Sequence, residues 1–374
     1  MSKLNNKVLL FVDRLEMGGI QTLLFNILSH FNDSPLKFDL LLLDDGTTYD
    51  LEKNFTELGV GIYKLNGVWI NQPFDYVPYC KALDQFYKWH HDYLAVHLHS
   101  SSKNFLVLRY AKKYGIKKRI AHSHNTDFQS NSLLKKFFGT IFRYPLKYYA
   151  TDYFACSSLA AQWMFGEKEV SKGHVTVFPN VIDTEKFSYC ERTRREYRTE
   201  LGIENKFVIG NIGRFTYQKN HSFLIDIFKK IHDVRSDSVL LLAGVGELLE
   251  DCKEKCERLG IDDAVFFLGY RNDISQLLHA MDFFVMPSLY EGFPVTVVEA
   301  QASGVSVILS DTITKEVKLT PLVHYFELNQ GSQEWAKEIL AISHTNRDGW
   351  ADVLCDKGYD VKTAVKTLEN VYLN

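Results

Sequence analysis

Short apolar runs alternate with amphipathic segments along this chain, and the alternation begins twice. The apolar runs of the first series lie at residues 8–12, 38–43, 60–65 and 93–99. Helical patterns separate them, for example at residues 19–30 and 77–91. Strand-like runs that are joined by helical segments predict a sheet of parallel strands with crossover helices.

The first series ends before a polar, charged stretch, ERTRREYRTE at residues 191–200, which we interpret as an exposed connecting segment. The apolar runs of the second series lie at residues 207–214, 239–244, 264–269, 282–287 and 305–310. Helical patterns cover residues 220–234 and residues 359–372. Because 374 residues suit two domains of ordinary size, we predict an α/β protein with two Rossmann-like, doubly wound domains that face each other across a cleft.

The composition excludes several classes of protein. A net charge of -3 and a hydrophobic content of 46% are typical of a soluble globular protein, and nothing in them points to nucleic acid. No apolar run approaches the ~18 residues that a membrane-spanning helix needs. The run at residues 8–12 is followed by Asp13 and Arg14 and does not make a signal peptide. We therefore expect a cytoplasmic protein whose cysteines, which form no C-x-x-C pair, are reduced.

The most informative segment is YEGFPVTVVEAQASG at residues 290–304, because it places two carboxylates around the start of a helix. Pro294 suits the first position of a helix, so Glu291 lies in the preceding loop and Glu299 lies about two turns inside. At ~1.5 Å rise per residue, the two carboxylates are roughly 12 Å apart along the axis. Each can accept hydrogen bonds from the hydroxyl groups of a ligand.

The start of the same helix offers a binding site for an anion. The amides of Gly292, Phe293 and Val295 have no partner within the helix and can bind a phosphate. A phosphate-sized anion between two hydroxyl-rich groups is the layout of a nucleotide-sugar.

Two more loops follow predicted strands, where ligands of parallel sheets bind. Arg214 and Lys219 follow the first strand of the second series and could contact a diphosphate from two sides. The alternative is a pair of solvated surface cations. Gly18 and Gly19 follow the first strand of the chain, where they would leave helix-start amides accessible to a substrate, although a simple tight turn explains them equally well.

Histidines also follow predicted strands. His122 and His124 come after the strand KKRIA, so a histidine there could contact a sugar hydroxyl or transfer a proton, or it could be an ordinary polar loop residue. His97 and His99 end another strand and are weaker candidates. No two aspartates are two residues apart, so the D-x-D motif that holds a divalent ion on a nucleotide-sugar is absent, which favours a metal-independent reaction without a cofactor.

A basic stretch with interleaved aromatic residues lies between residues 97 and 150. Among its cations, Lys135, Lys136, Arg143 and Lys147 lie between the aromatic residues and are assigned to this surface. Basic and aromatic residues on one surface favour anionic lipid headgroups. We therefore predict that this surface binds the inner face of the cell membrane or the acceptor. The alternative is a solvated helix face over buried aromatic rings. Nucleic acid is not expected, because no recognised nucleic-acid-binding module accompanies the charge.

These motifs, taken in order, resemble the retaining glycosyltransferases of family 4, which have the two-domain GT-B fold. The resemblance covers nearly the whole chain and rests on MGGIQ (17–21), AHSHN (121–125), ACSSLAAQWMFG (155–166), FPNVID (178–183), GNIGRFTYQKN (210–220), LLLAGVGEL (240–248), FLGYRNDI (267–274) and the E-x7-E segment. The first three of these are similar to enzymes of capsular and exopolysaccharide assembly. One departure is Val181, where the family commonly has glycine after the asparagine.

The resemblance implies a role for each motif residue. The residues implied in catalysis are Arg214, Lys219, Glu291 and His124. The residues implied in donor binding are Gly18, Gly19, Gly246, Tyr270, Arg271, Gly292, Phe293, Val295, Thr296 and Glu299. The last helix of this fold returns to the amino-terminal domain, which implies an acceptor-binding domain of residues 1–185 with 356–374 and a donor-binding domain of residues 186–355.

The implied activity is a metal-independent transfer of a sugar, with retention, from a nucleotide-sugar to a glycan or lipid-linked acceptor. Two alternatives stay open from the sequence. The first is a nucleotide-sugar epimerase of similar architecture, and the second is a non-catalytic partner that binds a nucleotide-sugar.

Overall fold

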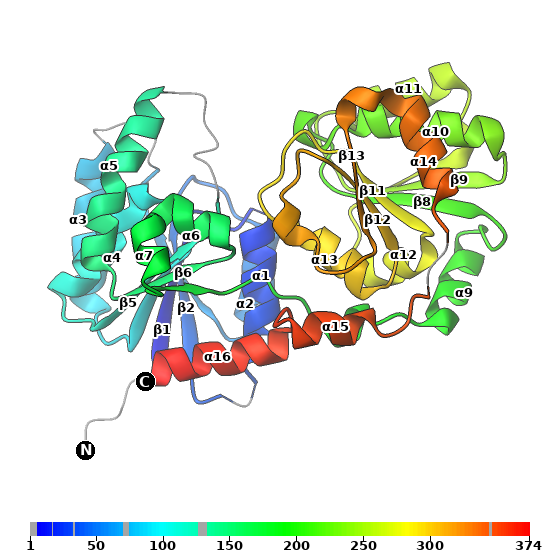
Figure 1. The fold of residues 1–374 in the computed structure, drawn as a ribbon. Helices are drawn as coiled ribbons and strands as arrows, with labels where there is room; N and C mark the ends of the chain where they lie inside the picture. The colour runs from blue at the N-terminus through cyan, green and yellow to red at the C-terminus, as the bar shows by residue number, and fades with distance from the viewer. Residues whose placement is uncertain (1–5, 17, 33, 70–74, 126–132, 344–345) are drawn as a thin grey trace. The chain divides into compact units, whose positions relative to one another are not determined.

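The chain folds into two compact units (Figure 1). The structure is a computed structural model that describes residues 6–16, 18–32, 34–69, 75–125, 133–343 and 346–374, with only the backbone for residues 133–136. Unit 1 consists of Met1–Val181 and Val361–Asn374, and unit 2 of Ile182–Asp360. The chain therefore passes between the units at 181/182 and 360/361, whereas the sequence predicted these points at 185/186 and 355/356.

Unit 1 contains a seven-stranded parallel sheet in the order β3-β2-β1-β4-β5-β6-β7. Its strands are β1 (Lys7–Val12), β2 (Lys37–Leu43), β3 (Gly61–Leu65), β4 (Ala95–Leu98), β5 (Lys118–Ser123), β6 (Asp152–Ala155) and β7 (Val175–Val177). Its helices are α1 (Gly19–Leu28), α2 (Asp50–Glu57), α3 (Tyr76–Trp89), α4 (Phe105–Lys113), α5 (Leu133–Tyr149), α6 (Ser158–Phe165), α7 (Glu167–Ser171) and α16 (Val361–Leu373).

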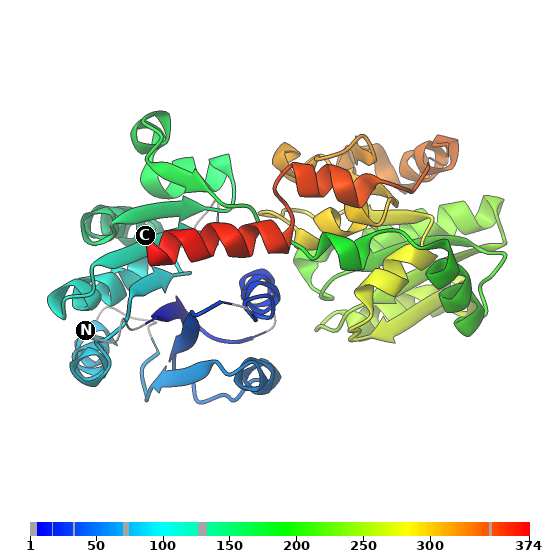
Figure 2. The same ribbon diagram turned by 90° about the horizontal axis from the view of Figure 1, so that it is seen from below.

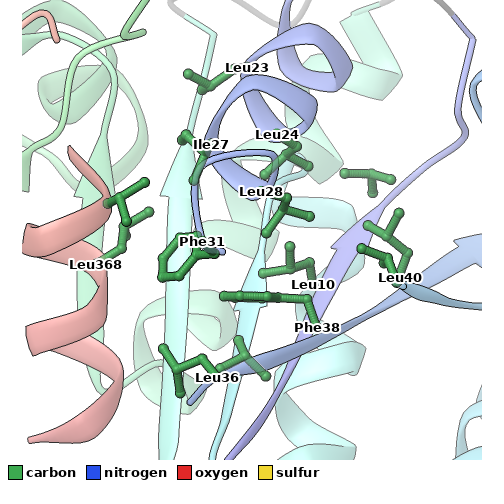
Figure 3. Close-up of a cluster of buried hydrophobic side chains, with 14 of the residues drawn as sticks. Leu10, Leu23, Leu24, Ile27, Leu28, Phe31, Leu36, Phe38, Leu40 and Leu368 are labelled. Carbon is green, nitrogen blue, oxygen red and sulfur yellow. The ribbon is translucent and has the colours of Figure 1, made fainter. Parts of the chain in front are cut away.

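Both faces of this sheet are buried, so its strands are apolar throughout rather than alternating. In β1, Leu10 and Val12 pack into the core beneath α1 and α16, while Leu9 and Phe11 pack into the core on the opposite face. Figure 3 shows the first of these cores, where Leu368 of α16 joins the α1 residues Leu23 and Ile27. Figure 2 shows α16 running along unit 1 beside α1.

Unit 2 repeats the same design with a six-stranded parallel sheet in the order β10-β9-β8-β11-β12-β13. Its strands are β8 (Phe207–Ile212), β9 (Ser238–Ala243), β10 (Val265–Gly269), β11 (Phe283–Met286), β12 (Ser306–Ser310) and β13 (Val323–Phe326). Its helices are α8 (Thr184–Phe187), α9 (Glu191–Glu200), α10 (His221–Val234), α11 (Leu249–Leu259), α12 (Ile274–Ala280), α13 (Val295–Ala302), α14 (Gly331–Ala341) and α15 (Trp350–Asp356). The predicted fold class, two doubly wound α/β domains, is confirmed.

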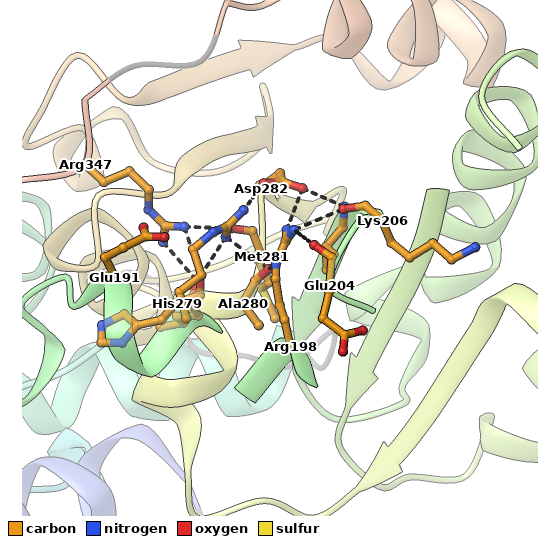
Figure 4. A network of polar contacts seen from close by, with 12 residues as sticks. Glu191, Arg198, Glu204, Lys206, His279, Ala280, Met281, Asp282 and Arg347 are labelled. Carbon is orange, nitrogen blue, oxygen red and sulfur yellow. Dashed lines mark hydrogen bonds and ion pairs between the residues drawn. The ribbon is translucent and has the colours of Figure 1, made fainter. Parts of the chain in front are cut away.

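The interpretation of residues 191–200 as an exposed connecting segment was wrong. The segment forms α9, in which Tyr197 and Arg198 are buried. Arg198 donates from Nη2 to Oδ2 of Asp282 at 2.8 Å and from Nε to the carbonyl of Ala280 at the end of α12, and Figure 4 shows this network. Arginine side chains therefore attach this polar helix to unit 2, a role that hydrophobic patterning cannot reveal.

No helix among the described residues is both long and apolar enough to cross a bilayer.

Candidate active site

The residues that the sequence predicted for donor binding in unit 2 gather at the carboxyl ends of its strands. Arg214 follows β8, Gly246 follows β9, Tyr270 follows β10 and Glu291 follows β11. These four strands are neighbours in the sheet. The edge of a doubly wound sheet where the strand order changes direction is the usual position of a ligand site.

An ion pair between two predicted catalytic residues lies at this edge. Nζ of Lys219 is 2.7 Å from Oε1 of Glu291, and only 18% and 8% of the two side chains are exposed. The stem of Lys219 runs along Gly213, where an added Cβ would lie 3.4 Å from its Cδ and Cε. Because both charges are shielded from water, the Coulomb attraction between them is stronger than in a surface pair.

Two further residues, which were not among the predicted site residues, connect the loops that carry the pair. Gln218 donates from Nε2 to Oε2 of Glu291 at 3.1 Å and to the carbonyl of Tyr290 at 2.9 Å. Asn220 adopts a left-handed conformation with φ of 55° and donates from Nδ2 to the carbonyl of Pro287 at 3.1 Å. Asparagine tolerates this conformation better than most residues. These contacts join the loop after β8 to the loop after β11. The one sequence signal for them is the asparagine next to Lys219, a residue type that suits a left-handed turn.

The helix of the E-x7-E segment is α13, and it begins one residue later than predicted. Pro294 is its N-cap rather than its first residue, and no side chain caps the helix start. Gly292 has open space at its Cα, Phe293 stacks on Tyr359 with ring centroids 6.1 Å apart, and Val295 and Thr296 form the first turn. An uncapped helix start leaves its amides available to an anion.

Glu299 lies inside α13 and is only 7% exposed. Burial raises the pKa of its carboxyl to about 7, while the charge of Lys186 acts in the opposite direction. A buried carboxylate requires hydrogen-bond donors, and ligand hydroxyls can supply them.

The remaining predicted residues of unit 2 have distinct environments. Arg214 and Tyr270 are exposed, Tyr270 by 55%. Arg271 donates to Asp273 and, at 3.0 Å, to the hydroxyl of Tyr197, so its side chain holds the loop while its backbone stays at the sheet edge. An added Cβ at Gly246 would lie 2.4 Å from the carbonyl oxygen of Phe215, so this glycine is required by close backbone packing.

In unit 1, the predicted residues lie at the carboxyl ends of β1 and β5. Gly18 is the N-cap of α1, directly after the β1 loop, and an added Cβ at Gly19 would meet open space. His124 follows β5, where its Nε2 lies 3.0 Å from Nδ1 of His99. These residues and those of unit 2 belong to different compact units.

Unit 1 also has a hollow at the carboxyl ends of β1, β2 and β3. It measures about 450 Å³ and is lined by Arg14, Asp44, Asp45, Gly46, Gly67 and Trp69. The guanidinium of Arg14 lies over the Trp69 ring at 5.6 Å from its centroid. An aromatic ring beside hydrogen-bonding groups is a suitable surface for a sugar.

Three buried histidines are the described residues closest to a metal-ligand arrangement. One nitrogen from each of His97, His99 and His122 lies within 4.8 Å of the others. However, the rings of His97 and His99 pack against each other in a tilted arrangement, with centroids 4.0 Å apart and an angle of 30° between planes. Metal ligands instead direct their ring edges toward one point, so hydrogen bonding accounts better for this cluster.

The predicted basic surface is only partly present on the described residues. The side chains of Lys135 and Lys136 lie outside the described part. Arg143 is partly buried over Trp163, at 4.5 Å from the ring centroid, and Nζ of Lys147 donates to the carbonyl of Phe165 at 3.3 Å. The two α5 cations whose side chains the structure describes therefore pack on their own unit. Among the α5 side chains that the structure describes, the exposed ones are mainly aromatic or apolar: Phe137, Phe138, Thr140, Ile141, Tyr144 and Tyr148.

Comparison with known proteins places both units in one group of enzymes. Residues 193–340 match the family "Glycosyl transferases group 1", and residues 17–186 match "Glycosyltransferase Family 4". EpsF of Bacillus subtilis strain 168, which is named as a glycosyltransferase, is 31% identical over 379 residues, covering 100% of this chain and 97% of that protein.

A second relative, from Escherichia coli, is named UDP-Gal:alpha-D-GlcNAc-diphosphoundecaprenol alpha-1,3-galactosyltransferase. It is 36% identical over 141 residues, which cover 37% of this chain and 36% of that protein. Among solved structures, Anabaena HepE in complex with UDP and glucose has a TM-score of 0.76 and 20% identity, covering 98% of this chain and 99% of that one. WaaG, a glycosyltransferase involved in lipopolysaccharide biosynthesis, has a TM-score of 0.64 and 15% identity, covering 98% and 99%. The chain therefore belongs to the family 4 glycosyltransferases and has the GT-B fold.

Proposed function

We propose that this glycosyltransferase moves a sugar from a UDP-linked donor, with retention and without a metal ion, to a glycan or lipid-linked acceptor in cell-surface polysaccharide synthesis. The observation that carries the proposal is the shielded Lys219–Glu291 pair beside the uncapped start of α13. A cation and free helix amides suit a diphosphate, and a carboxylate suits sugar hydroxyls. HepE, which shares the fold, was crystallised with UDP and with UDP-glucose.

The chemistry requires the bond between the sugar C1 and the diphosphate oxygen to break while the acceptor oxygen bonds to C1. Lys219, Arg214 and the amides of α13 stabilise the charge that develops on the departing diphosphate. Glu291 and Glu299 accept hydrogen bonds from the sugar and the ribose. In this scheme the acceptor attacks from the side of the leaving group, and its proton passes to the departing diphosphate oxygen. The missing D-x-D motif supports neutralisation by side chains and amides instead of a divalent ion.

The acceptor binds unit 1 in this proposal. The hollow beside Trp69 and Arg14 supports a sugar-binding surface there, and the name of the Escherichia coli relative describes a lipid-diphosphate acceptor. The likeness of the MGGIQ, AHSHN and ACSS motifs to enzymes of exopolysaccharide assembly supports the same class of acceptor.

Substitution of the two cations tests the donor site. We expect Lys219→Ala and Arg214→Ala each to lower turnover by at least about a hundredfold, because each removes a preorganised charge that stabilises the leaving group. The measurement is UDP release in the presence of an acceptor, after a thermal-shift screen of nucleotide-sugars has identified the donor. Lys253→Ala is the control, since Lys253 is an exposed cation of α11 that pairs with Glu250.

Near wild-type turnover of both variants would refute the assignment. Donor that is isomerised without any acceptor would favour the epimerase alternative. Donor that binds but is neither transferred nor isomerised with any acceptor class would favour the non-catalytic alternative.

We also propose that the protein attaches peripherally to an anionic membrane through α5. Phe137, Ile141, Tyr144 and Tyr148 recur at helical spacing, and their exposed fractions are 61%, 42%, 72% and 70%. Lys112 of the adjacent α4 lies over the Tyr148 ring at 4.3 Å from its centroid and adds positive charge at this face. An aromatic stripe with flanking cations suits the boundary between headgroups and acyl chains.

Flotation with vesicles of phosphatidylglycerol and phosphatidylcholine tests this attachment. The wild-type protein should float, and Phe137→Ser combined with Tyr144→Ser and Tyr148→Ser should stay in the soluble fraction, because the apolar contact area is lost. Val77→Ser with Trp89→Ser is the control, as both residues are exposed on α3. Equal flotation of the α5 variant and the wild type would exclude this surface.

A further inference from the structure

Four imidazoles lie together at the carboxyl ends of β4 and β5, and they form two separate hydrogen-bonded chains. In the first chain, Nδ1 of His97 lies 2.6 Å from the hydroxyl of Tyr372, and its Nε2 lies 3.2 Å from Nδ1 of His122. In the second chain, Nδ1 of His99 lies 3.0 Å from Nε2 of His124. A neutral imidazole has one donor and one acceptor nitrogen, so each chain has a direction.

The direction of the first chain follows from Tyr372. This residue is 2% exposed, and burial keeps the pKa of its phenol well above the ordinary value, so the hydroxyl carries its proton. Tyr372 donates this proton to Nδ1 of His97, so the buried hydroxyl has a hydrogen-bond partner. His97 then carries its own proton on Nε2 and donates it to His122, and the Nε2 proton of His122 faces the backbone of Phe178.

The direction of the second chain follows from His99. Its Nε2 is buried and has no hydrogen-bond partner among the described residues. His99 also lines a small cavity whose other walls include Leu23, Ile27 and Phe178. A proton on Nε2 would leave a buried N–H unsatisfied, at a cost of about 1–3 kcal/mol. The opposite direction of the chain would place that unsatisfied proton on His99, whereas this direction places a proton on Nδ1 of His124, where the side chain of Asn180 can accept it. The proton of His99 therefore belongs on Nδ1.

We propose that His99 is a positioning residue that fixes His124 as the tautomer protonated at Nδ1. The lone pair of Nε2 in His124 is occupied by the proton of His99, so His124 can donate a hydrogen bond to a substrate oxygen but cannot remove a proton. This assignment settles between the two roles that the sequence left open for His124. Its catalytic consequence rests on the proposed glycosyl transfer, whereas the tautomer itself does not.

The surroundings of His124 agree with a neutral donor. Burial lowers the pKa of His124 to about 4, and the side chain of Asn180 acts in the opposite direction through a hydrogen bond. Nδ1 of His124 and Oδ1 of Asn180 are both buried, and neither has another hydrogen-bond partner among the residues described, so the Asn180 oxygen is the acceptor that is available to the Nδ1 proton of His124 until a substrate arrives. Asn180 belongs to the FPNVID motif, which connects the last strand of unit 1 to unit 2.

Two-bond ¹H–¹⁵N correlation spectra of the full-length protein at pH 7.5 test the tautomer directly, because they distinguish protonated from bare ring nitrogens. The signals of each histidine are assigned by their loss in single variants, such as His124→Gln. We expect His99 and His124 to be protonated at Nδ1, and His97 and His122 at Nε2. A charged His124, or one that is protonated at Nε2, would overturn the proposal without any substitution at His99.

Variants of His99 test its effect on the reaction. His99→Phe keeps the ring shape but removes the donor, so His124 should lose its single tautomer and kcat should fall by at least about tenfold. His99→Asn keeps an N–H near the position of Nδ1 and should restore kcat to within about threefold of the wild type. His97→Phe removes an equally buried ring from the other chain and should leave the tautomer of His124 unchanged.

The outcomes separate this proposal from the proposed function. Unchanged kcat in His99→Phe would remove the positioning role even if the tautomer is as assigned. If the wild-type protein transfers no sugar while His124 is protonated at Nδ1, the proposed function fails and the hydrogen-bond assignment stands.

Discussion

At the scale of single residues, the two glutamates of the E-x7-E segment differ in environment, which suits them to different roles. Glu291 has a cation at 2.7 Å and an amide at 3.1 Å, so its charge is already neutralised within the protein. Glu299 is buried, and Lys186 is the cation that acts on it electrostatically without a hydrogen bond. We therefore expect Glu299 to depend on a ligand far more than Glu291 does.

The raised pKa of Glu299 predicts how stability changes with pH. Because its pKa is about 7 in the folded protein and 4.5 ordinarily, the neutral carboxyl stabilises the folded state fully below pH 4.5. This contribution is lost as pH rises through 7. Glu299→Gln cannot ionise and should not lose stability in this way. The difference in unfolding free energy between the variant and the wild type should therefore shift by about 3 kcal/mol in favour of the variant from pH 4 to pH 8. Urea unfolding at several pH values measures it, and parallel curves for both proteins would contradict it.

At the scale of secondary-structure elements, α9 is attached to the end of α12 by arginines rather than by an apolar face. Arg194 and Arg198 both bind Asp282 and the carbonyl of Ala280 (Figure 4). Cations near the last carbonyls of a helix also interact favourably with its dipole. Burial alone would raise the pKa of Asp282, but the two arginines hold it below the ordinary value.

Asp282 is therefore the anion that compensates the charges of Arg194 and Arg198. Asp282→Asn should lower the unfolding free energy by about 3 kcal/mol at pH 7, because it leaves two largely buried guanidinium groups uncompensated. Chemical denaturation measures the effect. Asp237→Asn is the control, since its pair with Arg235 is exposed and should change stability by less than about 0.5 kcal/mol. A similar loss in both variants would show that the α9 network is no stronger than a surface pair.

The same element shows what the sequence could and could not predict. Most strands of both sheets followed from apolar runs, because buried parallel strands are apolar on both faces, but β6, β7 and β13 were not predicted. Tyr197 is the one apolar residue that α9 contributes to the core of unit 2, so no periodic pattern indicated this helix. The candidate site residues were predicted from motifs, but a motif does not give every role: Gln218 lies within GNIGRFTYQKN and was not singled out. Gln218 and His99 act through contacts that only the folded chain creates.

At the scale of the whole molecule, unit 1 is built from two segments that are separated in the sequence by unit 2, because the carboxyl-terminal helix belongs to unit 1. Val361, Val365, Leu368 and Tyr372 of α16 are buried in the core that contains Leu10 and α1. Each unit has its own pair of cores on the two faces of its sheet. The last residues of the chain are therefore needed to complete the first unit.

This discontinuity predicts where a substitution in the last helix will act. Leu368→Ala should cost about 3 kcal/mol, the scale for truncating a buried leucine, and the loss should fall on unit 1 although residue 368 follows unit 2 in the sequence. Hydrogen exchange followed by mass spectrometry should show faster exchange in peptides from residues 7–181 and unchanged exchange in residues 182–360. Leu373→Ala, at an end position that is 45% exposed, should change neither. Faster exchange throughout the chain in Leu368→Ala would mean that the two units unfold as one, so that the separate cores do not correspond to separate cooperative units.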